Sequence, residues 1–449
     1  MDFIASVPIL GDLITLVIPF LIVLGVVVFV HEYGHYIVGR WCGIGAQVFS
    51  IGFGPRLYAW RDKRGTEWQV AALPLGGFVK FVGDMDPASA GKMDEANLTQ
   101  AERKKAFHNA PLAARAATVA AGPFFNFALS IMLFTGLALA VGGASEEPVI
   151  GEVTDRLPET VDLRAGDRVL SMNGVAMETY ADIIGAIFEA DGADIAAVVE
   201  RGGTETAVTL SYPMEARIEG VSPGNPASSA GIIPGDVIVT LNGEPMATFR
   251  EVQIATVRLP LEAPITLGIR RDGEPDLLSF EIIPETVERP HPETGERTPL
   301  PTLGINGEGT AGLQPLRETL PITDAVEAGF SNTAGIITNT LGYIGDLVFG
   351  SAPADQLGGP IRIAQVSAER AERGFLDLIH LIAFLSTSIG LLNLFPIPVL
   401  DGGHLLFYAV EGARGRPVGE AAQRVGTMIG LSLVLLLMVF ATYNDVLRL

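Results

Sequence analysis

The chain has 449 residues, a mean hydropathy of +0.38 and only 18% charged residues, values typical of a polytopic membrane protein with soluble insertions. Its single cysteine excludes an intramolecular disulfide and any multi-cysteine zinc site, so a bound metal would need histidine and carboxylate ligands. The net charge of −21 argues against nucleic acid as a partner.

Four segments are long and apolar enough to cross a membrane. We expect transmembrane helices at about residues 13–35, 112–141, 376–400 and 425–442. The first could be the apolar region of a signal peptide, but no basic residue precedes it and no small-residue cleavage site follows it. We therefore predict a retained helix.

The first span ends in the motif His31-Glu32-Tyr33-Gly34-His35. On a helix, residues four apart project from one face, so both imidazoles can bind one metal ion. Glu32 lies next to the first ligand, where it can take a proton from metal-bound water. The pattern is short and also occurs by chance, so it needs support from the rest of the chain.

Loop charge predicts the orientation of the spans. Residues 40–115 carry 11 basic against 7 acidic residues, whereas residues 142–330 carry 12 against 32. The positive-inside rule then places residues 40–115 and 404–424 in the cytoplasm. Both termini and the acidic middle would lie outside, with the motif at the cytoplasmic end of its helix.

The region 43–83 after the motif does not have a helical pattern. Strand-forming stretches at 46–51 and 68–73 flank a charged turn at 61–65, which predicts a β-hairpin. A hairpin this apolar could dip into the membrane beside the metal site, and an ordinary cytoplasmic hairpin is the alternative. Residues 84–109 are polar and suit a partly helical connector.

The second span opens with Gly122-Pro123-Phe124-Phe125-Asn126. The Gly-Pro pair would loosen the helix near its start. Asn126 is a polar side chain within an apolar run, and such residues usually face a partner or a cavity. Helix–helix packing alone would also explain it.

The acidic middle contains an internal repeat. Residues 165–174 align with residues 234–243, and each copy continues into a helix-like stretch and strand-like alternation. This order resembles a PDZ domain, so we predict tandem PDZ-like modules at 149–212 and 216–285. The second has the fuller form, and we expect weaker peptide binding by the first.

Residues 286–371 are predicted to contain a linker rich in proline and charge, followed by an amphipathic helix on the outer surface at about 322–349. A fifth span there would separate the metal ligands on opposite sides of the membrane. We therefore expect residues 372–449 to form the C-terminal membrane part with two spans.

The third metal ligand should lie at the cytoplasmic end of another span. The third span runs inward and ends in Asn393-Leu394-Phe395-Pro396-Ile397-Pro398-Val399-Leu400-Asp401. Its two prolines break helical hydrogen bonding, which would let Asp401 turn inward, and an acid in an apolar segment needs a partner. We expect His404 at a surface or interface rather than beside the metal.

The combination of these motifs resembles the site-2 protease family of intramembrane zinc metalloproteases, most closely its bacterial regulator-of-sigma-E protease group. The matching stretches are 22–35, 73–83, 121–127, the repeat and 357–411. The resemblance implies one Zn²⁺ per chain. Its implied ligands are His31, His35 and Asp401, with Glu32 as the catalytic acid/base and Asn393, Pro396, Pro398 and Asn126 as substrate-binding residues.

The resemblance implies a polytopic α-helical protein of the bacterial inner membrane, with four transmembrane helices, a membrane-associated β-hairpin and tandem extracytoplasmic PDZ-like α+β domains. It would hydrolyse single-span membrane proteins, such as an anti-sigma factor already trimmed outside, in regulated intramembrane proteolysis of an envelope-stress response. A membrane-tethered PDZ scaffold with a vestigial site is the competing function, although every ligand and the base are present.

Overall fold

The chain divides into two compact units. The first is built from residues 1–140, 320–345 and 355–446, and the second mainly from residues 141–319. The computed structural model describes residues 8–83, 99–153, 161–190, 193–210, 215–221, 225–261, 263–290, 297–307, 313–348 and 358–447. Most of the predicted connector at 84–109 therefore lies outside the described residues.

Four long helices of the first unit contain stretches long and apolar enough to cross a membrane, as the sequence predicts. They are α2 (Pro8–Trp41), α4 (Leu112–Val141), α10 (Phe375–Asn393) and α12 (Glu420–Leu447). Helix α10 ends at Asn393 rather than near residue 400, because Pro396 and Pro398 have no backbone N–H to continue the ladder.

Within its described residues, this unit also contains five shorter or more polar helices. They are α3 (Gln100–Arg103), η2 (Phe107–Asn109), α8 (Ile322–Val348), α9 (Pro360–Arg373) and α11 (Asp401–Arg414). Helix α8 covers the segment where a surface helix is expected, near 322–349, and it is not among the candidate spans of the described residues. Buried hydroxyls join the apolar helices, as Thr387 Oγ1 donates to Ser130 Oγ at 2.6 Å.

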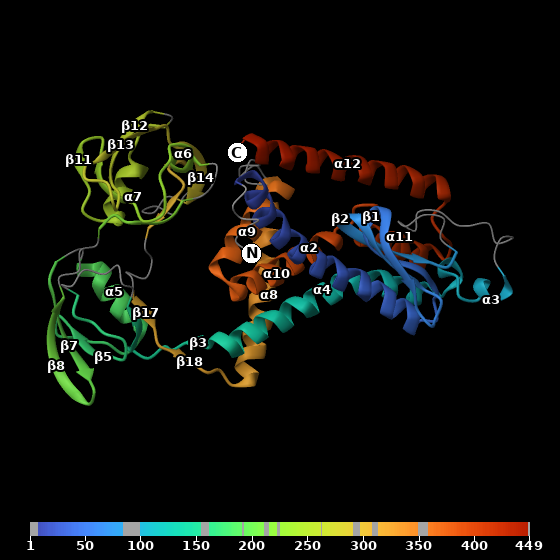
Figure 1. Cartoon of the computed structure of the whole chain (residues 1–449), viewed down its shortest axis with the longest axis horizontal. Coiled ribbons are helices and arrows are strands. Elements are labelled where there is room, and N and C mark those ends of the chain that lie inside the picture. The colour runs from blue at the N-terminus through green and yellow to red at the C-terminus, as the bar shows by residue number, and fades with distance from the viewer. Residues whose placement is uncertain are drawn as a thin grey trace. The chain divides into compact units, whose positions relative to one another are not determined.

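The predicted hairpin is present, and its strands are longer than expected. Strand β1 (Ala46–Arg61) pairs antiparallel with β2 (Glu67–Phe81), and both lie beside α2 (Figure 1). Positive φ at Gly52 and Gly54 bends β1, so residues 46–51 pair with both 67–70 and 77–81. Residues 77–81 consequently form one edge of the sheet.

In the second unit, the two repeat copies fold alike. The first has the sheet order β6-β5-β7-β8 and the second β11-β10-β12-β13, each with one helix of nine residues or more. The first copy comprises β5 (Arg168–Met172), β6 (Val175–Ala176), α5 (Tyr180–Ala190), β7 (Ile195–Arg201) and β8 (Thr204–Leu210). The second comprises β10 (Val237–Leu241), β11 (Glu244–Pro245), α7 (Phe249–Val257), β12 (Ile265–Arg270) and β13 (Leu278–Ile282).

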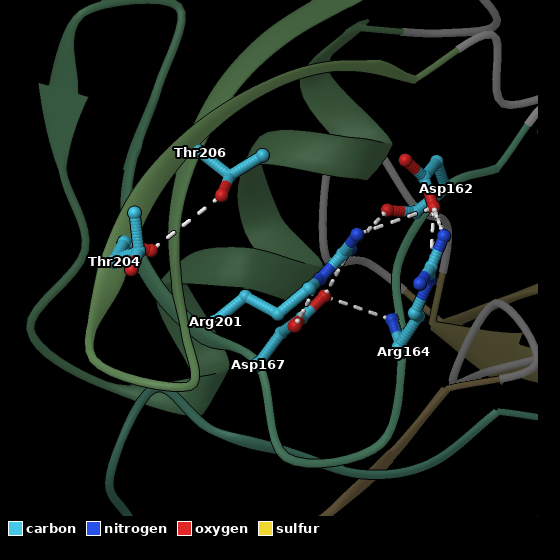
Figure 2. Close-up of polar contacts among 6 residues, drawn as sticks. All are labelled: Asp162, Arg164, Asp167, Arg201, Thr204 and Thr206. Atoms are coloured by element: carbon cyan, nitrogen blue, oxygen red, sulfur yellow. Dashed lines mark hydrogen bonds and ion pairs between the residues drawn. The ribbon is translucent and has the colours of Figure 1, made fainter.

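The aspartate of the Gly-Asp pair in each repeat has a structural role. Asp167 is 1% exposed and accepts two 2.8 Å hydrogen bonds from Arg201, as Figure 2 shows. Asp236 accepts the equivalent pair from Arg271 at 2.8 and 2.7 Å. Each carboxylate raises the pKa of its guanidinium, mainly by accepting these hydrogen bonds. A buried carboxylate is stable only when it is paired in this way.

Segments after the repeats supply further strands. These pairs are β3 (Gly143–Ala144) with β18 (Arg317–Glu318), β4 (Ile150–Val153) with β17 (Leu313–Pro315), β9 (Ile218–Val221) with β16 (Ile305–Gly307), and β14 (Glu285–Pro290) with β15 (Arg297–Thr302). A one-turn helix α6 (Pro226–Ser229) follows β9. Leu313 is fully buried in the core of the first copy and Leu303 packs in that of the second. The region expected as a linker thus contributes to both cores.

Candidate functional site

The C-terminal half of α2 and the first residue of α11 bring three ligand atoms together. His31 Nε2 lies 3.2 Å from His35 Nε2, because the two residues are one helical turn apart. Asp401 Oδ2 lies 3.1 Å from the first ring nitrogen and 3.4 Å from the second. The spacing predicted from sequence is therefore realised, and residues some 370 positions apart meet at one point.

These atoms fit a zinc ion. Ligands about 2.1 Å from a tetrahedral zinc stand about 3.4 Å from one another, close to the separations observed here. Asp401 Oδ2 is buried and accepts no well-formed hydrogen bond. Two imidazole nitrogens and one carboxylate oxygen are also a donor set typical of catalytic zinc, which keeps its fourth position for water.

A backbone carbonyl fixes the tautomer of His35. Its Nδ1 lies 2.9 Å from the carbonyl oxygen of Thr118 on α4. A carbonyl can only accept, so Nδ1 must carry the hydrogen and Nε2 presents a lone pair toward Asp401. Metal-binding histidines are usually oriented by such a second contact.

Asn126 lies behind His31 rather than on the wall of a cavity. Its side chain is fully buried, and its amide nitrogen lies 3.3 Å from His31 Nδ1, while its Oδ1 has no hydrogen-bond partner. The amide can be turned about its axis without changing its shape. In the turned orientation Oδ1 accepts from the Nδ1–H of His31, which directs the Nε2 lone pair toward Asp401.

Two glycines allow α2 and α4 to approach this closely. A Cβ at Gly34 would lie 2.6 Å from the carbonyl oxygen of Ala121, and one at Gly122 would overlap the ring of His35 and lie 2.9 Å from that of His31. Small residues at crossing points are typical of membrane helices. Gly34 and Gly122 belong to motifs noted in the sequence, but their role there was not predicted.

The hairpin reaches the same site through the edge of β2. Gly77 packs against Glu32, since a Cβ at position 77 would lie 2.9 Å from Glu32 Cγ. The backbone of Val79 on the same edge lies near the Glu32 carboxylate. The edge strand therefore holds the candidate base beside the ligand cluster.

A cavity of about 400 Å³ opens at this cluster. Besides His31, Glu32, His35 and Asp401, its lining comprises Phe53, Gly77, Phe78, Val79, Phe81, Phe107, Val119, Asn393, Val399, His404 and Tyr408. Asn393 therefore lies on the cavity wall. His404, expected at a surface or interface, also lines the cavity, because it follows Asp401 by three residues on α11 and shares its face.

The two predicted substrate-binding prolines do not line the cavity. Pro398 packs against α12, where a Cβ at Gly430 would overlap its carbonyl oxygen, and Pro396 is exposed. Val399, between Pro398 and Asp401, has a φ of 130°, a strained conformation for a β-branched residue. This turn replaces the end of the third span and leads directly into Asp401.

A His-Glu-x-x-His helix with a third carboxylate ligand, among helices able to cross a membrane, defines a membrane zinc metalloprotease. Comparison with known proteins agrees. The model of peptidase family M50 matches residues 19–437. The chain is 40% identical over 439 residues to "Putative zinc metalloprotease Atu1380" of Agrobacterium fabrum, covering 97% of each chain. It is 32% identical over 468 residues to "Protease RseP" of Yersinia pestis, covering 96% of this chain and 98% of that one.

The chain therefore belongs to peptidase family M50, the site-2 protease family. It is a bacterial membrane protein and a zinc metalloprotease. The resemblance inferred from its motifs is confirmed.

Gly122 offers a direct test of the ligand cluster. We expect Gly122→Ala to lower the zinc content of the purified chain severalfold, because the added methyl group displaces both imidazoles. Gly136→Ala is the matched control, since nothing lies within 4 Å of its Cβ position on the same helix. Zinc is measured by atomic absorption and helix content by circular dichroism. Equal zinc in both variants would contradict the assignment.

Proposed function

We propose that the chain is an intramembrane zinc endopeptidase in which His31, His35 and Asp401 hold the metal and Glu32 is the general base. The convergence of three buried lone pairs beside a carboxylate, at the wall of a cavity, carries this proposal. A bound zinc ion would polarise the scissile carbonyl and acidify water in its fourth position.

The chain's own residues would then move the proton. Glu32 takes it from the attacking water and delivers it to the leaving amine, which requires a carboxylate that reaches both positions. The sheet edge at Gly77 and Val79 holds Glu32 in place. Thr118 orients His35 and Asn126 orients His31, so that the Nε2 lone pair of each ring points toward the metal position.

The substrate would be the transmembrane segment of a single-span membrane protein. A helix cannot be hydrolysed while its amides are bonded internally, so the substrate must bind in extended form. Residues 77–81 form a sheet edge that, within the described residues, pairs with a strand on one side only, and they line the cavity. Strand addition there would satisfy the substrate backbone, with Asn393 binding it from the opposite wall.

Pro396 and Pro398 would contribute indirectly, by holding the turn that ends α10 and presents Asn393 and Asp401. Asn126, expected to bind substrate, is proposed instead to orient His31, because its side chain is fully buried behind that ring.

The β1–β2 hairpin would lie in the membrane, since Phe53, Leu57 and Trp60 are exposed large apolar side chains.

The second unit would select substrates. We assign its two repeat copies as PDZ-like modules outside the cytoplasm that exclude proteins with bulky external domains. A trimmed anti-sigma factor in an envelope-stress response fits this filter, and one relative carries the name "Protease RseP".

Loop charge supports an inner-membrane topology with external termini and a site near the cytoplasmic face, which a reporter fused after Leu449 would test.

Glu32→Gln separates chemistry from metal binding. We expect this variant to keep one zinc per chain and to lose cleavage of a co-expressed single-span substrate by at least about a hundredfold, because general-base catalysis contributes roughly 10² to 10⁴ in rate. His35→Ala should lose both zinc and cleavage. Cleavage by Glu32→Gln at the parental rate would contradict the proposed mechanism.

The two asparagines should give opposite results. Asn126→Ala is expected to lower zinc affinity about tenfold, as loss of an outer contact to a ligand does. Asn393→Ala should keep parental zinc affinity and raise KM for the substrate, because it lines the cavity without contacting a histidine nitrogen. A zinc loss confined to Asn393→Ala would reverse these assignments.

The filter is tested by removing the second unit. Strands β3 and β18 bring Gly143 and Glu318 together as a cross-strand pair, so a short loop can replace residues 143–318. The shortened chain should cleave an untrimmed substrate that the full chain leaves intact. A deletion that stays active on trimmed substrate yet still rejects the untrimmed one would argue against the filter.

A further inference from the structure

The third ligand is the only one of the three carried by α11, and it is the first residue of that helix. No side chain caps this end. The preceding turn contains the strained Val399, and α10 has already ended at Asn393. Gly402 and Gly403 pack closely against the backbone of the preceding turn at residues 394–397 and hold the start of α11. Contacts further along the helix then fix its direction, and with it the exact place of Asp401.

One strong polar contact is available there. Glu411 on α11 forms a two-pronged ion pair with Arg115 on α4, with N–O distances of 2.6 and 3.2 Å. Both side chains are mostly buried, at 14% and 16% exposure. Arg115 also donates to the Ala110 carbonyl and lies over the ring of Tyr408, which lines the cavity.

Arg115 belongs to a face of α4 that already serves the metal site. Positions 115, 118, 122 and 126 are spaced by three and four residues, so they share one side of the helix. Thr118 orients His35, Gly122 packs against both rings and Asn126 lies behind His31. Through Glu411, the same face also reaches the helix that carries Asp401.

We propose that the Arg115–Glu411 ion pair positions Asp401 at the metal, so that one face of α4 sets all three ligands. This inference rests on the proposed ligand set. Arg115 and Glu411 are positioning residues, since neither touches the ligand atoms. A guanidinium suits the role because its planar fork fixes direction as well as distance.

Glu411 lies far enough from Asp401 along α11 for a small change in helix direction to disturb the metal–ligand distances. Ten residues of helix separate Glu411 from Asp401, a rise of about 15 Å. A change of about 5° in the direction of α11 shifts its two ends relative to each other by about 1.3 Å, whereas metal–ligand distances tolerate about 0.2 Å. Losing the pair should weaken metal binding without removing a ligand.

The experiment measures metal affinity of the full chain purified in detergent, with Co²⁺ as a visible probe and a chelator as competitor. Arg115→Glu and Glu411→Arg should each weaken Co²⁺ binding roughly tenfold, the range for groups that orient ligands. The double variant, which restores the pair with reversed polarity, should recover to within about threefold of the parent. Arg115→Lys should be intermediate, because it keeps the charge and loses the fork.

Arg414→Glu is the matched control: it changes the charge equally and lies exposed on the same helix. It should bind Co²⁺ like the parent. Single variants with parental affinity and an unchanged Co²⁺ spectrum would overturn the inference, as would a double variant as weak as the product of its singles. A parent that bound no metal would instead overturn the proposed function itself.

Discussion

The structure depends on the convergence of three electron-pair donors, His31 Nε2, His35 Nε2 and Asp401 Oδ2, in a buried place. The two ring nitrogens and the carboxylate oxygen lie 3.1 to 3.4 Å from one another. Since Nδ1 of His35 donates to the Thr118 carbonyl, Nε2 of its neutral ring has a lone pair available to a metal. Such an arrangement is costly in a medium of low dielectric constant and becomes favourable once a cation is bound. The surrounding helices are built to keep it in place, from the Gly34–Ala121 approach to the carbonyl of Thr118.

Much of this site could be predicted from sequence, because its first part is local. The helical period puts His31 and His35 on one face, and hydropathy locates the spans that the helices confirm. The prolines before Asp401 correctly predicted a break, and the charged turn at 61–65 correctly predicted the hairpin. Asp401 is predictable because it is the acid that returns to the same membrane face, a constraint of topology rather than of spacing.

The other parts of the site depend on which faces of the helices contact one another. The periodicity of a single helix does not show this. Thr118 contributes a carbonyl, which every residue has, so no pattern could single it out. Asn126 is recognisable as a polar residue in an apolar run, but no local pattern shows that it faces His31. In the second unit, Leu313 and Leu303 complete two cores from segments that look like a linker, because short edge strands tolerate proline and carry weak periodicity.

Two of the segments that line the cavity have a backbone that is not helical. Residues 77–81 of β2 form one wall, and the turn from Asn393 to Asp401 forms another. In a lipid environment each unpaired backbone group costs several kcal/mol, so irregular segments persist only where protein or water satisfies them. On the proposed mechanism the same condition applies to the substrate, which must give up helical bonds before it can be cut. A strand edge beside Glu32 offers replacement bonds at the point of cleavage, so unwinding is cheapest where the catalytic residues lie.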